Sequence, residues 1–166
     1  MKKVVHNLVT VGLLGGLALF VSGCVDFGPG KYTGGGVMDS AVEDGAKASL
    51  GFNMQALDKD EDGMVDTVKG QLQYKDRGSD VSLHGVVDGA TVIFPWFGDK
   101  ESIGAFTGTY RPQPKGESGE FTVYVFDEGE PGPSEEDSFT IEVSGGEYDG
   151  YTNSGLLNKG NIKFHE

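Results

Sequence analysis

Alternation of apolar and polar residues is the feature that most limits how this chain can fold. In the segment 48–56 the even-numbered residues are Ala, Leu, Phe, Met and Ala, whereas the odd-numbered residues are Ser, Gly, Asn and Gln. The same period of two recurs in 68–75, 81–87, 121–126, 139–143 and 162–164. A period of two places successive side chains on opposite faces of a strand, so these segments are predicted to be half-buried β-strands.

Turns separate these runs at intervals of roughly ten residues. Glycine, proline and acidic residues fill the connections, and no window carries a convincing helical repeat. This pattern is typical of antiparallel all-β domains. We therefore predict an antiparallel β-sandwich or barrel of about 8 to 10 strands, with a first edge strand in 31–38. The run 90–97 is apolar on both parities, so we expect it to lie between two layers or to turn a corner at Pro95, with Trp96 in the core.

The first 23 residues have the order of an export signal. Two lysines precede an apolar stretch at 8–21, which is followed by the small residues Ser22 and Gly23. The apolar stretch is too short for a membrane span, and no stop-transfer flank follows it. We expect residues 1–23 to be a cleaved signal peptide, 24–30 a lipidated tether and 31–166 a single all-β domain.

The one cysteine of the chain directly follows this segment. The four residues Val21-Ser22-Gly23-Cys24 resemble the lipobox of bacterial lipoproteins, in which the cysteine is lipidated on sulfur and becomes the new amino terminus. The resemblance implies that Cys24 carries acyl chains, which at about 0.8 kcal/mol per buried CH2 form a stable membrane anchor. The alternative is a chance cysteine beside an ordinary cleavage site. An aspartate after the cysteine favours the inner membrane in that family, but Val25 stands there, so we expect the outer membrane or the cell surface.

Charge limits the kinds of partner that the domain can have. Removal of residues 1–23 leaves 11 basic against 26 acidic residues, a net charge of −15. Such a surface repels nucleic acid and anionic lipid headgroups and attracts cations, so we expect no nucleic-acid partner. Because no cysteine follows Cys24, a metal ion is the usual candidate for an additional cross-link.

Several phrases resemble a known domain of exported bacterial proteins. The phrases are GAKASLGFNMQA, GQLQYKDRGSDVSLHGVV, FTVYVFDEGEPGPSEEDSFTIEV and SGLLNKGNIKFHE. Together they resemble the small all-β domain called the post-COAP domain, over most of residues 31–166. The resemblance implies an all-β fold and an exported location, but no catalytic residue and no activity. It also leads us to expect a shorter connection than the acidic loop at 58–66.

That acidic loop, DKDEDGMVD, connects two of the predicted strands. Carboxylates stand at its positions 1, 3, 5 and 9 and glycine at position 6, which is the spacing at the start of a calcium-binding loop. The loop offers hard oxygen ligands and neither histidine nor thiol, which argues against zinc. An EF-hand is excluded because Lys69 stands at position 12, where a glutamate is needed, and because both flanks alternate with a period of two.

The loop is similar instead to the nine-residue hairpin loop D-x-D-x-D-G-x-x-D of integrin α-subunit propeller blades. The resemblance implies that calcium is bound by the side chains of Asp58, Asp60, Asp62 and Asp66 and by the carbonyl of Met64, with Glu61 pointing outward. The alternative is an acidic hairpin in which Asp62-Gly63 only forms the turn. Repulsion among the carboxylates favours the bound ion, so we predict a structural calcium ion.

Signals of catalysis are few. The second acidic loop, 127–137, matches no calcium template and is predicted to be a solvated run of charge. His84 lies on the polar parity of its strand, His165 lies next to the terminus, and no hydrolase, metalloprotease or phosphate-loop motif occurs. We predict a binding or structural module of the bacterial cell envelope, with an envelope protein or glycan as partner. The alternative is a hydrolase of an envelope polymer whose acids lie in the two acidic loops.

Overall fold

The structure is a computed structural model, and it describes residues 30–61, 65–95, 102–128 and 137–165. The predicted signal peptide, Cys24 with its lipobox and the tether up to residue 29 lie outside these residues, as do Trp96 and most of the second acidic loop. Within the described ranges, no helix is long and apolar enough to span a membrane.

The described chain forms nine β-strands in one antiparallel sheet. The strands are β1 (Gly30–Asp39), β2 (Lys47–Leu57), β3 (Thr67–Asp76), β4 (Val81–Pro95), β5 (Ser102–Pro112), β6 (Gly119–Asp127), β7 (Ser138–Ser144), β8 (Thr152–Leu156) and β9 (Lys159–His165), with one short 3-10 helix, η1 (Gly146–Tyr148). Strands that are neighbours in sequence pair as far as β8, and β9 returns to pair with β1, so the order is β8-β7-β6-β5-β4-β3-β2-β1-β9. The prediction of an all-β fold is confirmed.

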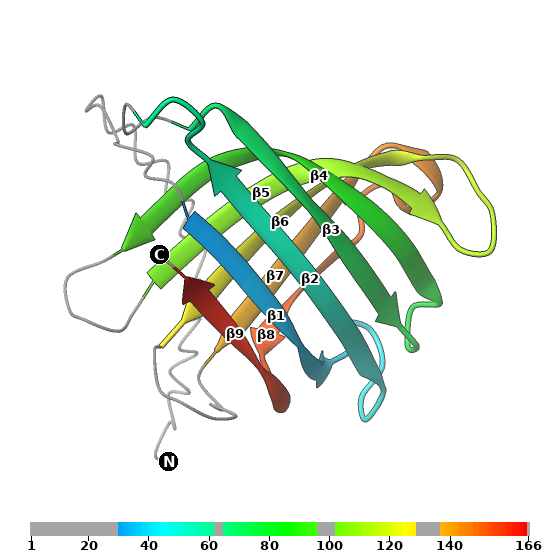
Figure 1. The fold of residues 1–166 in the computed structure, drawn as a ribbon. Coiled ribbons are helices and arrows are strands. Elements are labelled where there is room, and N and C mark those ends of the chain that lie inside the picture. Colours follow the sequence, from blue (N-terminus) through cyan, green and yellow to red (C-terminus); the bar gives the residue numbers. More distant parts are fainter. Residues whose placement is uncertain (1–29, 62–64, 96–101, 129–136, 166) are drawn as a thin grey trace, which may run out of the picture.

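The sheet curls strongly, so that β9, β1, β2 and β3 form a near wall and β5 to β8 lie behind it (Figure 1). The two ends of the strand order, β8 and β9, are joined by Leu157 and Asn158. The N–H of Leu157 donates to the carbonyl of Asp137 at 2.9 Å, and the N–H of Asn158 donates to the carbonyl of Val37 at 2.7 Å. This corner therefore links the start of β7 to β1 on the other side of the curled sheet.

The first strand lies inside the sheet and not at its edge. β1 pairs with β2 from Gly30 to Asp39 and with β9 from Lys31 to Val37. The expectation of a first edge strand is therefore wrong. The physical reason is that β9 buries its own apolar residue, Ile162, by pairing along the free side of β1.

Residues of the apolar parity fill the inside of the curled sheet, as the alternation predicts. Tyr74, Phe106, Phe121 and Phe139 are at most 2% exposed, and the ring centroids of Tyr74 and Phe139 are 6.0 Å apart. Glycine makes room for the rings, because a Cβ on Gly85 would lie 2.5 Å from the ring of Phe121. Each fully buried aromatic side chain contributes about 1.5–3 kcal/mol, so this packing is the main source of stability.

The longest strand, β4, contains most of the apolar run 90–97. It pairs with β5 as far as Pro95, and its register shifts between Val87 and Gly89 and again between Ala90 and Val92. Such irregularities bend a strand and increase its twist. The bend of this run therefore begins before Pro95, where a corner was expected.

Candidate functional site

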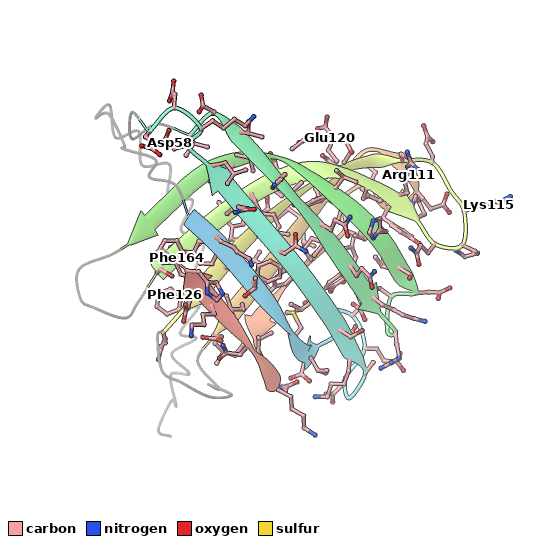
Figure 2. The ribbon with its side chains drawn as sticks, in the orientation of Figure 1. Asp58, Arg111, Lys115, Glu120, Phe126 and Phe164 are labelled. Atoms are coloured by element: carbon pink, nitrogen blue, oxygen red, sulfur yellow. The ribbon has the colours of Figure 1, made fainter. Side chains whose placement is uncertain are left out.

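The hairpin between β2 and β3 brings together three of the predicted calcium ligands. Asp58, Asp60 and Asp66 each offer a carboxylate oxygen, and these oxygens lie within 4.8 Å of one another. Asp58 directly follows β2 at this tip of the molecule (Figure 2). Two oxygens that bind one calcium ion at 2.3–2.6 Å are at most about 5 Å apart, so the spacing suits a shared ion. The other two predicted ligands, Asp62 and Met64, lie outside the described residues.

Hydrogen bonds within the loop orient two of the three carboxylates. The N–H of Glu61 donates to Oδ1 of Asp58, and the N–H of Lys59 donates to Oδ2 of Asp66, both at 2.7 Å. The N–H of Asp66 donates to the carbonyl of Leu57 at 2.9 Å and closes the hairpin. Glu61 turns the chain with a φ of 62°. The two strands thus hold positions 1 and 9 of the loop side by side.

The electrostatics of the group favour a cation. Two unit charges about 5 Å apart repel each other by roughly 1 kcal/mol even in water-like surroundings. Asp60 and Asp66 are exposed and form no ion pair with any residue that the structure describes. A hard divalent cation would replace this repulsion by attraction, and carboxylate oxygens are the ligands that calcium prefers.

A buried carboxylate at the end of β3 was missed by the sequence analysis. Asp76 is fully buried and accepts hydrogen bonds from Ser40 Oγ at 3.0 Å, from Gly78 N at 2.9 Å and from Tyr151 Oη at 2.8 Å. Burial alone would raise the pKa of Asp76, but these hydrogen bonds outweigh it and hold the pKa below its ordinary value. The sequence did indicate that Asp76 is buried, because Asp76 lies two residues after Tyr74 and therefore on the same buried face of β3.

The direction of the hydrogen bonds in this network follows from its geometry. Because Tyr151 donates its O–H to Asp76, Tyr74 must donate to Tyr151, whose oxygen lies 2.7 Å away. Asn153 Nδ2 in turn donates to Tyr74 at 2.8 Å. Burial raises the pKa of Tyr74 to about 12 and raises that of Tyr151 as well, so both phenols keep their protons at neutral pH. The hydrogen bonds therefore run in one direction, from Asn153 through Tyr74 and Tyr151 to the carboxylate of Asp76.

An open groove of about 580 Å³ lies beside this network, lined by residues 39–41, β8 and Asn158. Ser40 and Asn153 belong both to the groove and to the network. The carboxylate that lines the groove, Asp39, forms an ion pair with Lys47. The lining includes no second carboxylate. The pair of acids that glycoside hydrolysis requires is therefore not assembled in this groove.

The two ends of the second acidic loop are buried, although a solvated run of charge was predicted. Asp127 and Asp137 are 7% and 1% exposed. Asp137 accepts the N–H of Ile162 at 2.6 Å, and Asp127 accepts the N–H of Phe164 at 2.7 Å. Burial raises the pKa of Asp137 even though its carboxylate accepts backbone hydrogen bonds. The prediction is wrong for these two residues because the N–H groups on the free edge of β9 need hydrogen-bond acceptors. Residues 129–136 of the loop lie outside the described ranges.

The two histidines of the domain do not form a catalytic arrangement within the described ranges. His165 Nε2 lies 2.9 Å from Thr33 Oγ1. His84 faces Gln73 on one side and Arg111 on the other. Neither histidine is paired with a described carboxylate, so neither is positioned as the general base of a nucleophile.

No protein-family model, curated protein or solved structure matched the chain. The fold and the loop therefore define the class of protein in structural terms alone. It is an all-β domain of one curled sheet, whose β2–β3 hairpin gathers three carboxylates at its tip.

Proposed function

We propose that the protein is a lipid-anchored, extracytoplasmic binding or structural module of the bacterial cell envelope, stabilised by one calcium ion at the β2–β3 hairpin. The observation that carries the proposal is the convergence of Asp58, Asp60 and Asp66, whose oxygens lie within 4.8 Å of one another. The side chain of Asp62 and the carbonyl of Met64 supply the remaining protein ligands in this proposal. Five such oxygens, with water, give the coordination number that calcium requires.

The ion has a structural role in this proposal. β2 and β3 pair from Ala48 with Asp76 to Leu57 with Thr67, and both strands belong to the near wall. A cation at the tip removes the repulsion between the carboxylates and cross-links the two strands. Because the chain has no cysteine after Cys24, the ion would do for this domain what a disulfide does for other exported domains.

A binding or structural role is favoured over hydrolysis. The buried carboxylate of Asp76 already accepts three hydrogen bonds, and the exposed carboxylate of Asp39 is paired with Lys47. Neither carboxylate is therefore free to act as a general acid or base on a bound polymer. Envelope proteins and glycans remain the proposed partners.

The anchor in this proposal is Cys24. β1 begins at Gly30, and even a fully extended connection from Cys24 spans only about 20 Å. The domain would therefore stay close to the membrane surface, on the outer membrane or at the cell surface.

Calcium binding is tested by calorimetric titration of the purified chain. We expect one site, and we expect Asp60→Asn to weaken binding by roughly tenfold or more, because the charge and number of ligands set calcium affinity. Asp88→Asn, which changes an exposed aspartate on β4, is the matched control and should bind like the wild type. Absence of binding, or equal affinity of Asp60→Asn and the control, contradicts the proposed site.

Lipidation is tested by labelling cells with a radioactive fatty acid. The wild-type chain should carry label and sediment with membranes, whereas Cys24→Ser should carry none, because Cys24 is the one cysteine of the chain. If both proteins are released to the same extent and neither is labelled, the anchor does not exist.

A further inference from the structure

Six of the thirteen lysine and arginine residues of the chain lie on one outer surface of the sheet. The odd-numbered residues of β9, β1, β2 and β3 face away from the core, and they include Lys31, Lys47, Lys69, Lys75, Lys159 and Lys163. We call this surface the basic wall. One carboxylate, Asp39, shares the outward parity and pairs with Lys47. The wall is therefore strongly positive, whereas the whole chain has a net charge of −13.

Strand pairing arranges these lysines around a centre without charged residues. One row across the strands contains Lys69, Gln55, Lys31 and His165, and a second row contains Lys75, Ser49, Val37 and Lys159. Between them lies a row of Gln73, Gly51, Gly35 and Asn161. With strands about 4.8 Å apart and a rise of about 3.4 Å per residue, the lysines border an area of roughly 14 by 20 Å.

The centre of the basic wall is open and polar. A Cβ on Gly51 would meet no atom of the described residues within 4 Å, so none of their side chains covers this part of the sheet. Asn53, Gln71 and Gln73 are exposed around it. The large apolar side chains that are exposed in the described ranges lie on other parts of the chain. The wall thus offers amides and glycine backbone, bordered by ammonium groups.

Most of these lysines do not neutralise charges of the protein itself. Lys31, Lys69, Lys75, Lys159 and Lys163 are exposed and form no ion pair with any described residue. The chain has twice as many acidic as basic residues, so internal partners would be easy to supply. The positive charge of the wall is therefore available to an anionic ligand.

We propose that the basic wall binds an acidic polysaccharide. Ammonium groups pair with the acidic groups of such a polymer, while the amides of Asn53, Gln71 and Gln73 hydrogen-bond sugar hydroxyls. The glycine centre lets an extended chain lie close to the backbone. A single-stranded nucleic acid fits less well, because the outward residues of these four strands include no Trp, Tyr or Phe on which bases could stack. A lipid surface fits less well because the large apolar side chains that are exposed in the described ranges lie outside these four strands.

The proposal extends the binding role proposed above, and its test is separate from both the calcium site and the anchor. The full chain carrying Cys24→Ser is immobilised in buffer with chelator at about 50 mM salt, and polygalacturonate is compared with its methyl ester. The two polymers share a backbone and differ in charge. The chelator prevents calcium from bridging the polymer to the acidic hairpin, and Cys24→Ser removes the lipid. A negative result here therefore leaves the other two proposals unaffected.

We expect polygalacturonate to bind at least about tenfold more tightly than the ester, and the binding to disappear at about 500 mM salt. Lys163→Gln and Lys115→Gln each remove one positive charge, but Lys163 is on the wall and Lys115 lies in the β5–β6 loop at the far end of the sheet (Figure 2). Lys163→Gln should weaken binding about twofold to fivefold, whereas Lys115→Gln should not. The combined change of Lys31, Lys69 and Lys163 to Gln should weaken it about tenfold or more.

Thermal unfolding of each variant checks that these exposed substitutions leave the fold intact. Equal binding of polygalacturonate and its ester overturns the proposal, and so do equal effects of Lys163→Gln and Lys115→Gln. Tighter binding of single-stranded DNA or of phosphatidylglycerol vesicles than of polygalacturonate assigns the wall to a different class of ligand and also overturns it.

Discussion

Asp76 ties three distant parts of the chain together at one end of the sheet. Ser40 belongs to the turn after β1, Tyr151 directly precedes β8, and Asp76 itself ends β3. A buried carboxylate is costly, but each hydrogen bond to a charged group contributes about 1.5–3 kcal/mol, and Asp76 accepts three. The network therefore fixes the relative positions of these segments.

Asp76→Asn should lower the free energy of unfolding by about 1–3 kcal/mol at pH 7. An amide offers one acceptor and places an N–H2 group against donors, so at least one hydrogen bond of the network is lost. Urea unfolding measures the change. Asp88→Asn, at an exposed position on β4, is the control and should change the free energy by less than about 0.5 kcal/mol.

The same pair of proteins tests the pH dependence of the network. The pKa of Asp76 is lowered in the folded state, so between the folded and unfolded values the unfolded chain binds more protons and stability rises with pH. The contribution of Asp76 is complete above the unfolded pKa of about 3.9 and is lost as the pH falls through the lowered value. The stability difference between wild type and Asp76→Asn should therefore shrink in strong acid. A difference that stays constant from pH 7 down to strong acid would show that the charge of Asp76 is not what the network stabilises.

The sequence predicts contacts within one loop better than contacts between residues that are far apart in the chain. Asp58, Asp60 and Asp66 belong to one nine-residue loop, so their spacing alone predicted that their carboxylates meet. The two side chains that donate to Asp76 are 36 and 75 residues away, and only the register of the whole sheet brings them together. The sequence indicated only that Asp76 lies on the buried face of its strand. It did not indicate which residues donate hydrogen bonds to it.

At the scale of elements, β9 shows how the sheet protects its edge. A free strand edge presents unpaired N–H groups that invite pairing with other chains. On β9 the N–H groups of Ile162 and Phe164 donate to Asp137 and Asp127 instead. Side-chain carboxylates from β6 and from the segment before β7 thus replace the carbonyls of a further strand.

Asp137→Ala should lower the free energy of unfolding by about 1–3 kcal/mol, because it leaves the buried N–H of Ile162 without an acceptor. Hydrogen exchange should show faster exchange of the Ile162 amide, while amides in the middle of β2 change only with global stability. Asp44→Ala, in the exposed turn between β1 and β2, is the control. Unchanged protection of Ile162 in Asp137→Ala would mean that the carboxylate does not secure this edge.

The elements were predicted well where their signal is local. Period-two alternation placed strands where β2, β3, β4, β6, β7 and β9 lie, and glycine, proline and acidic clusters placed the turns. The neighbours of β1 were not predicted correctly, because alternation shows which side of a strand is buried but not which strand pairs with it. The buried ends of the second acidic loop escaped prediction for the same reason.

At the scale of the whole molecule, net charge was a poor guide to the surface. The composition predicts an acidic surface that repels anionic partners, yet the curled sheet gathers six lysines on β9, β1, β2 and β3 and places three carboxylates at the β2–β3 tip. The outward parity of each strand can be read from the sequence. The union of four strands into one wall depends on the pairing of β9 with β1, which the sequence analysis did not predict.

In the function proposed for this protein, calcium stabilises the domain through the β2–β3 hairpin. The direct measurement is the thermal unfolding midpoint of the chain carrying Cys24→Ser, recorded in calcium at about 100 times the dissociation constant and again in chelator. Binding at that concentration stabilises the folded state by about 2.7 kcal/mol, so the midpoint should rise by roughly 10 °C in calcium. The rise should fall to about half or less in a second protein that also carries Asp60→Ala, because a tenfold weaker site is only about ten times above its dissociation constant at the same calcium concentration. An unchanged midpoint in the first protein, or an equal rise in both, contradicts the claim.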